Sequence, residues 1–300
     1  MQFSIIVTSH NQRTFIRDAV DSALAACTPG TQVIVVDDAS TDGSQEILCS
    51  YGEAIHFVTL EDRHGASGAR NYGVSLATGR YLVFLDGDDA LQPWALRVYE
   101  RVVQEKEPKL LLASRLWFRG ALPRFGVEDY PHKIQLVEYE DYMSKDRRFG
   151  PSASALVVER EALQTVRGWS PEFAGMEDLD LLIKLGNAGR TVQILSPTTC
   201  SYRLHTGNVS NDVPRYMNEM RKVLSMESEG AYPGGQERRL ERYAVLGGHV
   251  FSWIKKGFRA SLYRDVVRLA AAGWPMVFAA VLHKFRVLLS RRHAAETVAV

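Results

Sequence analysis

The chain has 300 residues, of which 46% are hydrophobic and 24% charged, a balance typical of a globular protein with a sizeable core. A net charge of only +1 argues against a general nucleic-acid-binding protein. The three cysteines, Cys27, Cys49 and Cys200, lie far apart and in no metal-binding spacing, which predicts free thiols in a reducing compartment. We expect no signal peptide, because the chain leads directly into an apolar strand, and no apolar run approaches the roughly 20 residues of a membrane span. These features predict a cytoplasmic globular protein.

The first half of the chain alternates strand and helix patterns. Strands are predicted at residues 3–7, 32–36, 55–60 and 81–85, and helices at 15–24, 44–49 and 69–77. This alternation predicts an α/β fold with a mixed, mostly parallel, Rossmann-like sheet and flanking helices. Ligands bind such sheets beyond the carboxyl ends of the strands, where this sequence places the polar clusters 8–11, 37–44 and 86–89.

The second half is less regular between residues 114 and 148. A strand is predicted at 152–158, a helix at 177–188, and short strands at 192–195 and 200–204. After Pro214 the strand patterns stop, and the rest is predicted to be helical. We therefore predict two regions, residues 1–212 and a helical region 213–300, with the boundary near Asp212.

Acidic residues follow the strand at 81–85 directly, in the order Asp86-Gly87-Asp88-Asp89. Carboxylates fixed at a strand end suit a hard divalent cation that retains waters and bridges substrate phosphates. The alternative is a simple turn, because Asp and Gly favour turns.

A second acidic pair, Asp37 and Asp38, ends the strand at 32–36. A carboxylate there can accept hydrogen bonds from a nucleotide base or ribose. Gly65-Ala66-Ser67-Gly68-Ala69-Arg70-Asn71 places small residues and an arginine at a helix start. This segment favours a phosphate site, although a helix start with an exposed arginine is the simpler alternative.

The helix predicted at 177–188 opens with the acids Glu177, Asp178 and Asp180. Acids in a first helical turn are stabilised by the helix dipole, and one of them alternatively serves as a general base in the pocket. The residues alone leave both readings and all three carboxylates open. His205, at the end of the strand 200–204, is either structural or a ligand.

Taken in order, these segments resemble the inverting family-2 glycosyltransferases of the glycosyltransferase A fold, of the type that builds bacterial cell-surface glycans. The matching segments are Ile5-Ile6-Val7-Thr8-Ser9-His10-Asn11, Val36-Asp37-Asp38-Ala39-Ser40-Thr41-Asp42-Gly43-Ser44, Ala69-Arg70-Asn71, Asp86-Gly87-Asp88-Asp89, Glu177-Asp178-Leu179-Asp180-Leu181 and Tyr202-Arg203-Leu204-His205. They cover about the first two thirds of the chain. The first segment departs from the commoner family form, which has Pro at the position of Thr8 and Tyr at that of His10.

The resemblance implies a role for each matching residue. Asp178 is the expected general base. The expected metal ligands for Mn²⁺ or Mg²⁺ are Asp88, Asp86 and His205. The donor nucleotide sugar, expected to be a UDP-sugar, is assigned to Thr8, Asn11, Asp38, Arg70, Asn71, Asp86 and Gly87, and the acceptor to Glu177 and Trp169.

The implied activity is that of a hexosyltransferase acting on a glycan or lipid-linked acceptor. Asp178 takes the proton of the acceptor hydroxyl while that oxygen attacks the anomeric carbon, which inverts it. The alternatives are a nucleotide-sugar-binding protein without turnover and a nucleotidyltransferase. A nucleotidyltransferase is expected to have a glycine-rich basic loop after its first strand, and residues 8–12 lack one.

The charge is unevenly distributed. Residues 253–293 contain nine Lys or Arg and one acid, Asp265, which makes this segment +8 and the remainder −7. An apolar stripe runs through the same segment at helical spacing: Val277, Phe278, Val281, Leu282, Phe285, Leu288 and Leu289. Such a helix can lie in the interface of an anionic membrane, and the expected location is the inner face of the cell membrane. Packing on the catalytic domain, or on a second subunit in a homo-oligomer, is the alternative.

Overall fold

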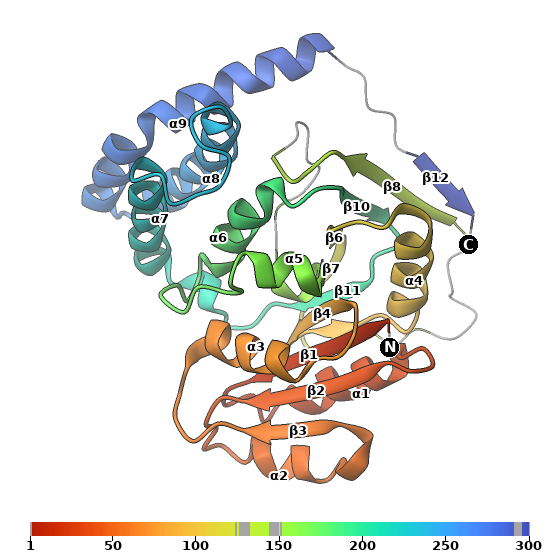
Figure 1. Cartoon of the computed structure of the whole chain (residues 1–300). Coiled ribbons are helices and arrows are strands. Elements are labelled where there is room, and N and C mark those ends of the chain that lie inside the picture. Colours follow the sequence, from red (N-terminus) through yellow and green to blue (C-terminus); the bar gives the residue numbers. More distant parts are fainter. Residues whose placement is uncertain are drawn as a thin grey trace.

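The computed structural model describes residues 2–123, 125, 133–143, 150, 152–290 and 296–299, with side chains up to His283. Figure 1 shows a large twisted sheet with helices on both faces and the long C-terminal helices gathered to one side. This arrangement is the expected α/β fold with a helical C-terminal region.

The large sheet has the strand order β12-β8-β10-β6-β9-β4-β1-β2-β3 among the described residues, and a small sheet has the order β5-β11-β7. The strands are β1 (Phe3–Ser9), β2 (Gln32–Asp37), β3 (His56–Thr59), β4 (Tyr81–Asp86), β5 (Ala90–Leu91), β6 (Leu110–Ala113), β7 (Arg115–Phe118), β8 (Lys133–Tyr139), β9 (Leu156–Glu159), β10 (Thr191–Ser196), β11 (Cys200–Arg203) and β12 (Glu296–Ala299). Strands β3, β2, β1 and β4 are parallel, whereas β9 runs antiparallel to β4 and β6, and β8 antiparallel to β10 and β12. The sheet is therefore parallel in its N-terminal half and mixed beyond β4.

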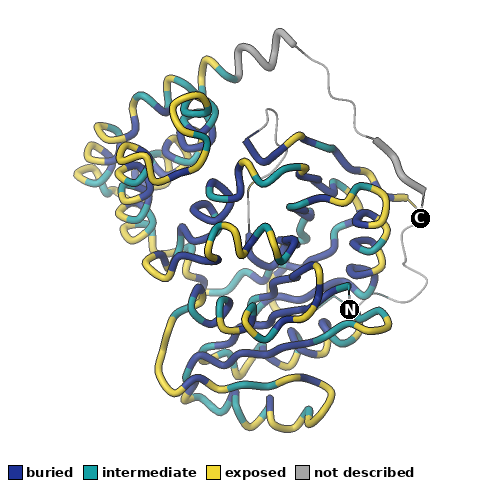
Figure 2. Tube along the Cα trace, viewed as in Figure 1, coloured by how far each residue is buried: buried dark blue, intermediate teal, exposed yellow. Residues whose placement is uncertain are grey.

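The helices cover both faces of the sheet. They are α1 (Ile16–Ala26), α2 (Ser44–Cys49), α3 (Gly65–Leu76), α4 (Ala95–Lys106), α5 (Arg160–Thr165), α6 (Glu177–Lys184), α7 (Val213–Ser228), α8 (Arg239–Arg259) and α9 (Tyr263–Ser290). Successive side chains of a strand point to opposite faces, so Ile5 and Val7 of β1 pack with α1, α2 and α4. Ile6 packs in a second core with α3 and α5–α9. Figure 2 shows the central strands, such as β1 and β4, buried between these layers, which explains their continuous apolar runs, whereas the edge strand β3 is partly exposed.

The C-terminal helices pack closely against one another, and their core is continuous with that on one face of the sheet. Leu224, Val245 and Leu269, from α7, α8 and α9, belong to the same buried core as Phe84 of β4. Asp212 caps α7 by accepting a hydrogen bond from the backbone N–H of Arg215 at 3.1 Å. The division near Asp212 is therefore a change of secondary structure within one shared core.

Two expectations for the C-terminal region are wrong. Residues Glu296–Ala299 form β12, which pairs with β8, so the chain is not helical throughout after Pro214. One helix of the described residues, α9 across Tyr263–His283, is also long and apolar enough to cross a membrane by length and composition alone. Arg264, Asp265 and Arg268 interrupt the apolar run in the sequence, but the average over the helix remains apolar.

Two neighbouring glycines of α8 allow a matched test of this packing. A Cβ on Gly247 would lie 1.9 Å from the carbonyl oxygen of Met276 in α9, whereas a Cβ on Gly248 would meet nothing within 4 Å. We expect Gly247→Ala to lower the free energy of unfolding by about 1–3 kcal/mol or more, because the two backbones must separate. Gly248→Ala is expected to raise it by about 0.5–1 kcal/mol, since alanine favours a helix. Urea unfolding of both variants measures the difference, and equal stabilities would contradict the close approach of α8 and α9.

Candidate active site

A polar pocket lies at the carboxyl ends of the parallel strands. Pairing places Thr8 of β1 beside Asp86 of β4, and Ser9 beside Asp37 of β2, so the acids that end these strands meet at one edge. The pocket has a volume of about 380 Å³. Eight residues of the predicted site line it: Thr8, Asp38, Arg70, Asp86, Gly87, Asp88, Glu177 and Asp178. A larger hollow of about 780 Å³, lined by Lys109, Glu159 and Tyr232 among others, contains none of them, so chemistry rather than size identifies the site.

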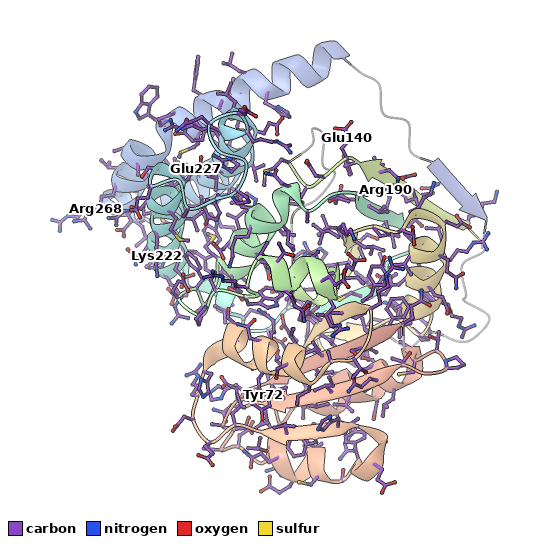
Figure 3. All side chains as sticks on the ribbon, viewed as in Figure 1. Tyr72, Glu140, Arg190, Lys222, Glu227 and Arg268 are labelled. Atoms are coloured by element: carbon purple, nitrogen blue, oxygen red, sulfur yellow. The ribbon has the colours of Figure 1, made fainter. Side chains whose placement is uncertain are left out.

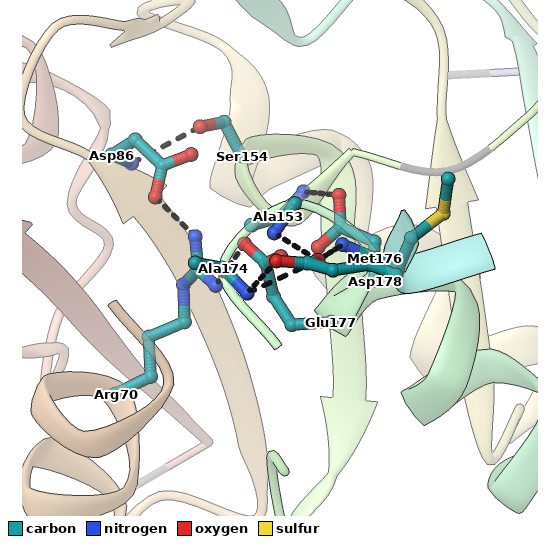
Figure 4. Close-up of polar contacts among 10 residues, drawn as sticks. Arg70, Asp86, Ala153, Ser154, Ala174, Met176, Glu177 and Asp178 are labelled. Carbon is teal, nitrogen blue, oxygen red and sulfur yellow. Dashed lines mark hydrogen bonds and ion pairs between the residues drawn. The ribbon is translucent and has the colours of Figure 1, made fainter. Parts of the chain in front are cut away.

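Arg70 of α3 joins the two sides of this pocket. Its guanidinium, which is 3% exposed, donates to Asp86 Oδ1 at 2.7 Å and to Glu177 Oε1 at 3.3 Å (Figure 4). The same group lies 4.5 Å from the ring centroid of Trp169. Burial lowers the pKa of Arg70, but the charges of Asp86, Glu177 and Asp178 outweigh burial and raise it. Arg70 is therefore a permanent buried cation between β4 and α6.

Asp178, the predicted base, lies in the first turn of α6. Its Oδ2 accepts a hydrogen bond from the backbone N–H of Ala153 at 3.1 Å, and its Oδ1 has no partner among the described residues (Figure 4). Burial, followed by repulsion from Glu177, raises the pKa of Asp178 to about 7, although Arg70 opposes the change. A carboxyl group poised near neutral pH with one unpaired oxygen is suited to accept a proton.

The predicted metal ligands lie together at the end of β4. His205 Nε2 is 2.8 Å from Asp88 Oδ2, and the imidazole ring packs on Phe15. Burial and the charge of Asp86 raise the pKa of Asp88, despite the contact with His205. Among the described residues no three His, Cys, Asp or Glu side chains converge as a complete metal centre. Two mutually repelling carboxylates and an imidazole do fit a hard divalent cation whose remaining ligands are waters and phosphate oxygens.

The next acid, Asp89, has a structural role. It is 1% exposed and accepts a hydrogen bond from the backbone N–H of Arg203 in β11 at 2.9 Å. Burial and repulsion from Asp88 and Asp86 raise its pKa well above the usual range. Arg203 in turn donates to the backbone carbonyl of Asp88 at 2.9 Å, so β11 and the acidic turn hold each other in place.

Asp38 and Asn11, both predicted to bind the donor, are engaged with the protein backbone. Asp38 accepts hydrogen bonds from the backbone N–H groups of His64 at 2.6 Å and Gly65 at 2.8 Å, which caps the start of α3. A carboxylate has about four acceptor positions, so Asp38 retains capacity for a base in the pocket that it lines. Asn11, with a φ of 53°, accepts from the N–H of Thr41 at 2.8 Å and is not among the lining residues. It joins the loops after β1 and β2.

Asn71 and Trp169 form a support beneath the pocket. Asn71 donates to the backbone carbonyl of Trp169 at 2.8 Å and accepts from its N–H at 2.9 Å. Trp169 is 1% exposed and packs edge-on against Phe84. Neither residue is among those that line the pocket, and the structure therefore does not bring Trp169 to the acceptor space predicted from the sequence. Both instead hold the segment before α6 and the ring under Arg70.

Helix α7 contributes residues that the sequence analysis did not identify. The carboxylate of Glu219 accepts hydrogen bonds from the successive N–H groups of Ala174, Gly175 and Met176, at 3.2, 2.9 and 3.0 Å. These three residues lead directly into α6 and Asp178. Tyr216 lines the pocket and contacts Gly175. Nothing in the local sequence around Tyr216 and Glu219, about 40 residues after the predicted base, indicates a role in the site. Only the folded structure shows that they reach it.

Comparison with known proteins identifies the family. The model for "Glycosyl transferase family 2" matches residues 4–147. A Bacillus subtilis protein described as a teichuronic acid biosynthesis glycosyltransferase, TuaG, is 30% identical over 213 residues, which cover 70% of this chain and 81% of that protein. The chain belongs to glycosyl transferase family 2. The family expected from the sequence motifs, a glycosyltransferase family similar to enzymes of bacterial surface-glycan synthesis, is thereby confirmed.

Other similar proteins extend the comparison. The Escherichia coli protein WfaP, a UDP-Glc:alpha-D-GlcNAc-diphosphoundecaprenol beta-1,3-glucosyltransferase, is 25% identical over 259 residues, covering 84% of this chain and 97% of that protein. The structure of S. aureus TarS 1–349 in complex with UDP-GlcNAc has a TM-score of 0.72 at 18% identity, covering 93% of this chain and 82% of TarS 1–349. A Pyrobaculum calidifontis mannosyltransferase in complex with GDP-Man and Mn²⁺ has a TM-score of 0.58 at 16% identity. The match covers 94% of this chain and 86% of that protein. These two structures support the glycosyltransferase A fold.

Glu219 allows a test of how α7 supports the site. We expect Glu219→Ala to lower kcat by roughly 10- to 100-fold with little change in donor KM, because the segment before Asp178 loses the acceptor of three N–H groups. Asn218→Ala, an exposed neighbour on the same helix, is the control. Steady-state kinetics at a temperature where circular dichroism shows both variants folded provides the measurement. A normal kcat for Glu219→Ala would show that α7 does not position the base.

Proposed function

We propose that this glycosyltransferase transfers the sugar of a UDP-sugar, with inversion and with a divalent cation, to a hydroxyl of a lipid-linked glycan. The observation that carries the proposal is the carboxyl group of Asp178, which lines the same pocket as the strand-end acids and has a pKa of about 7. The UDP donor is supported by the TarS complex with UDP-GlcNAc and by the donor named for WfaP. The lipid-linked acceptor is supported by the diphosphoundecaprenol substrate of WfaP.

In the proposed mechanism, the base of the donor lies at the β1–β2 side of the pocket, against Thr8 and Asp38. Asp178 accepts the proton of the acceptor hydroxyl as its oxygen attacks the anomeric carbon, and the bond to the diphosphate breaks on the opposite face. Arg70 already pairs with Asp86 and Glu177, so its first task is to hold these two acids in place. Its Nε has no partner among the described residues, which leaves one buried N–H for a phosphate oxygen.

Asp86, Asp88 and His205 would hold the cation. A bound Mn²⁺ or Mg²⁺ supplies electrostatic stabilisation of the departing diphosphate. The residues of this chain fit that task, because burial and then repulsion from Asp86 raise the pKa of Asp88, and a cation relieves this repulsion.

The finer features of organisation are also proposals. We assign residues 1–212 to the catalytic domain and 213–300 to a helical region whose first helix reaches the pocket through Tyr216. The three cysteines are free thiols, which supports a cytoplasmic location at the inner face of the membrane. Family membership decides against a nucleotidyltransferase. Binding without turnover is the remaining alternative. Release of nucleoside diphosphate, measured with a panel of nucleotide sugars, would distinguish catalysis from binding alone.

Asp178 provides the central test. We expect Asp178→Asn to retain donor binding and to lose roughly two to four powers of ten in transfer rate, because the amide cannot accept the proton. The base acts when ionised, so kcat/KM of the unaltered enzyme should rise with pH and level off above about 7. Glu177→Gln should be milder and should move this rise to lower pH, since it removes a charge that raises the pKa of Asp178.

Calorimetry measures donor binding, and pH-rate profiles measure the transfer rate and its pH dependence. Glu172→Gln, at an exposed position, is the control. An inactive Glu177→Gln beside a nearly normal Asp178→Asn would reverse the two assignments.

Asp88 tests the cation. We expect Asp88→Ala to abolish turnover and to weaken donor binding in the presence of Mn²⁺, while binding in excess chelator changes little, because the substitution removes a metal ligand. The exposed Glu46→Ala on α2 controls for loss of an acidic charge. Full activity of the unaltered enzyme in chelator, or unchanged metal-dependent binding by Asp88→Ala, would rule out the metal assignment.

A further inference from the structure

Helix α9 has apolar side chains on two opposite faces. Val266, Leu269 and Met276 are at most 4% exposed and pack into the core shared with α7 and α8. Six large apolar residues lie within an arc of roughly 100° on the other side of the helix, at 100° per residue. We call them the outer stripe: Tyr263, Val267, Trp274, Phe278, Val281 and Leu282.

The outer stripe faces solvent. Val267 and Trp274 are each 66% exposed and Phe278 is 59% exposed. Twelve large hydrophobic side chains are exposed among the described residues; six form the outer stripe and three more, Leu240, Phe251 and Phe258, lie on α8. Exposed apolar side chains gathered in this way mark an interaction surface rather than the scattered exposure usual for a globular protein.

Basic side chains lie beside the stripe. Arg264 and Arg268 occupy the next positions around α9, and Figure 3 shows Arg268 extending away from the protein. Lys255 and Arg259 are exposed on α8, and Lys255 lies 4.4 Å from the ring centroid of Phe251. Asp265 is the acid nearest in sequence and is 3.9 Å from Arg268. The chemistry is therefore an apolar strip with a cationic border.

We propose that the outer stripe of α9, with the basic residues beside it, docks the enzyme on the surface of a bilayer that contains anionic lipid. Apolar side chains enter the boundary between headgroups and acyl chains, and the arginines and lysines contact lipid phosphates. The fit between a cationic border and an anionic surface identifies the occupant.

Two observations favour the bilayer surface over the two other occupants, which are a membrane-spanning position for α9 and a second copy of the chain. A spanning helix is surrounded by lipid, but the inner face of α9 is fixed to the protein, with the backbone of Met276 against Gly247. A symmetric dimer that buried the stripe would place the cationic border of both copies in one interface, where like charges are unfavourable.

The docking surface and the pocket are joined through α7. Tyr216, which lines the pocket, stacks on Trp253 of α8 with ring centroids 4.4 Å apart. Near the end of α8, the ring of Phe258 packs edge-on against Tyr263, the first residue of the outer stripe. In the proposed docking, the pocket is therefore linked to the membrane-bound stripe through α7 and α8. This step rests on the proposed function, because it gives the pocket access to a lipid-linked acceptor.

Sedimentation of the full chain with vesicles tests the proposal independently of catalysis. We expect binding to phosphatidylcholine vesicles that contain phosphatidylglycerol, weakened by salt, and little binding to phosphatidylcholine alone. Trp274→Ser with Phe278→Ser should weaken binding by roughly tenfold or more. Arg264→Glu with Arg268→Glu should weaken it by at least ~25-fold, since each basic residue near an anionic surface contributes about fivefold.

Matched controls lie elsewhere on the surface. Tyr72→Ser removes an exposed aromatic from α3, and Arg97→Glu with Arg101→Glu reverses two exposed charges on α4; both should bind as the unaltered protein does. Donor binding without vesicles, measured for every variant, shows that the fold and the pocket are intact and separates failure of docking from failure of the proposed function. The proposal is overturned if stripe variants sediment like the controls or if binding is equal on uncharged vesicles. It is also overturned if the unaltered chain fails to bind, and a dimer that the stripe substitutions dissociate would identify a second copy as the occupant.

Discussion

The buried charge of Arg70 is the interaction on which the site depends. Its guanidinium binds Asp86 at the end of β4 and Glu177 at the start of α6, two acids far apart in the sequence. Removing one partner of a buried ion pair costs about 3–5 kcal/mol, because the other charge is left without compensation. Arg70 also opposes the burial that raises the pKa of Asp178. Without it, this carboxyl would hold its proton more tightly and serve less well as a base at neutral pH.

Much of the sheet and the nucleotide-facing part of the site could be predicted because their signals are local. Continuous apolar runs separated by amphipathic helices specify a sheet covered on both faces, as β1, β2 and β4 show. Parallel register then brings Thr8, Asp37 and Asp86 to one edge, whatever the details of the loops. The sequence indicated that these residues meet, but not whether Asp38 faces a ligand or the backbone of α3.

The parts that could not be predicted depend on contacts between distant segments. Periodicity shows that α9 has apolar side chains, yet which of its faces is covered depends on α7 and α8. Trp169 has the aromatic ring expected of a residue that contacts the acceptor, but in the fold this ring packs on Phe84 and its backbone is bound by Asn71. The helical region is also part of the site, because α7 packs with α8 and α9 and also holds the segment before Asp178 through Glu219.

Helix α3 fixes the separation between two parts of the candidate site. Its first N–H is held by Asp38, and Arg70 follows five residues after Gly65, a rise of about 8 Å along a rigid helix. In the proposed mode of donor binding, the base is recognised at one end of this segment and the phosphate charge at the other. The backbone of α3, rather than a loop, therefore sets the separation between the Asp38 contact and the residue that carries the guanidinium.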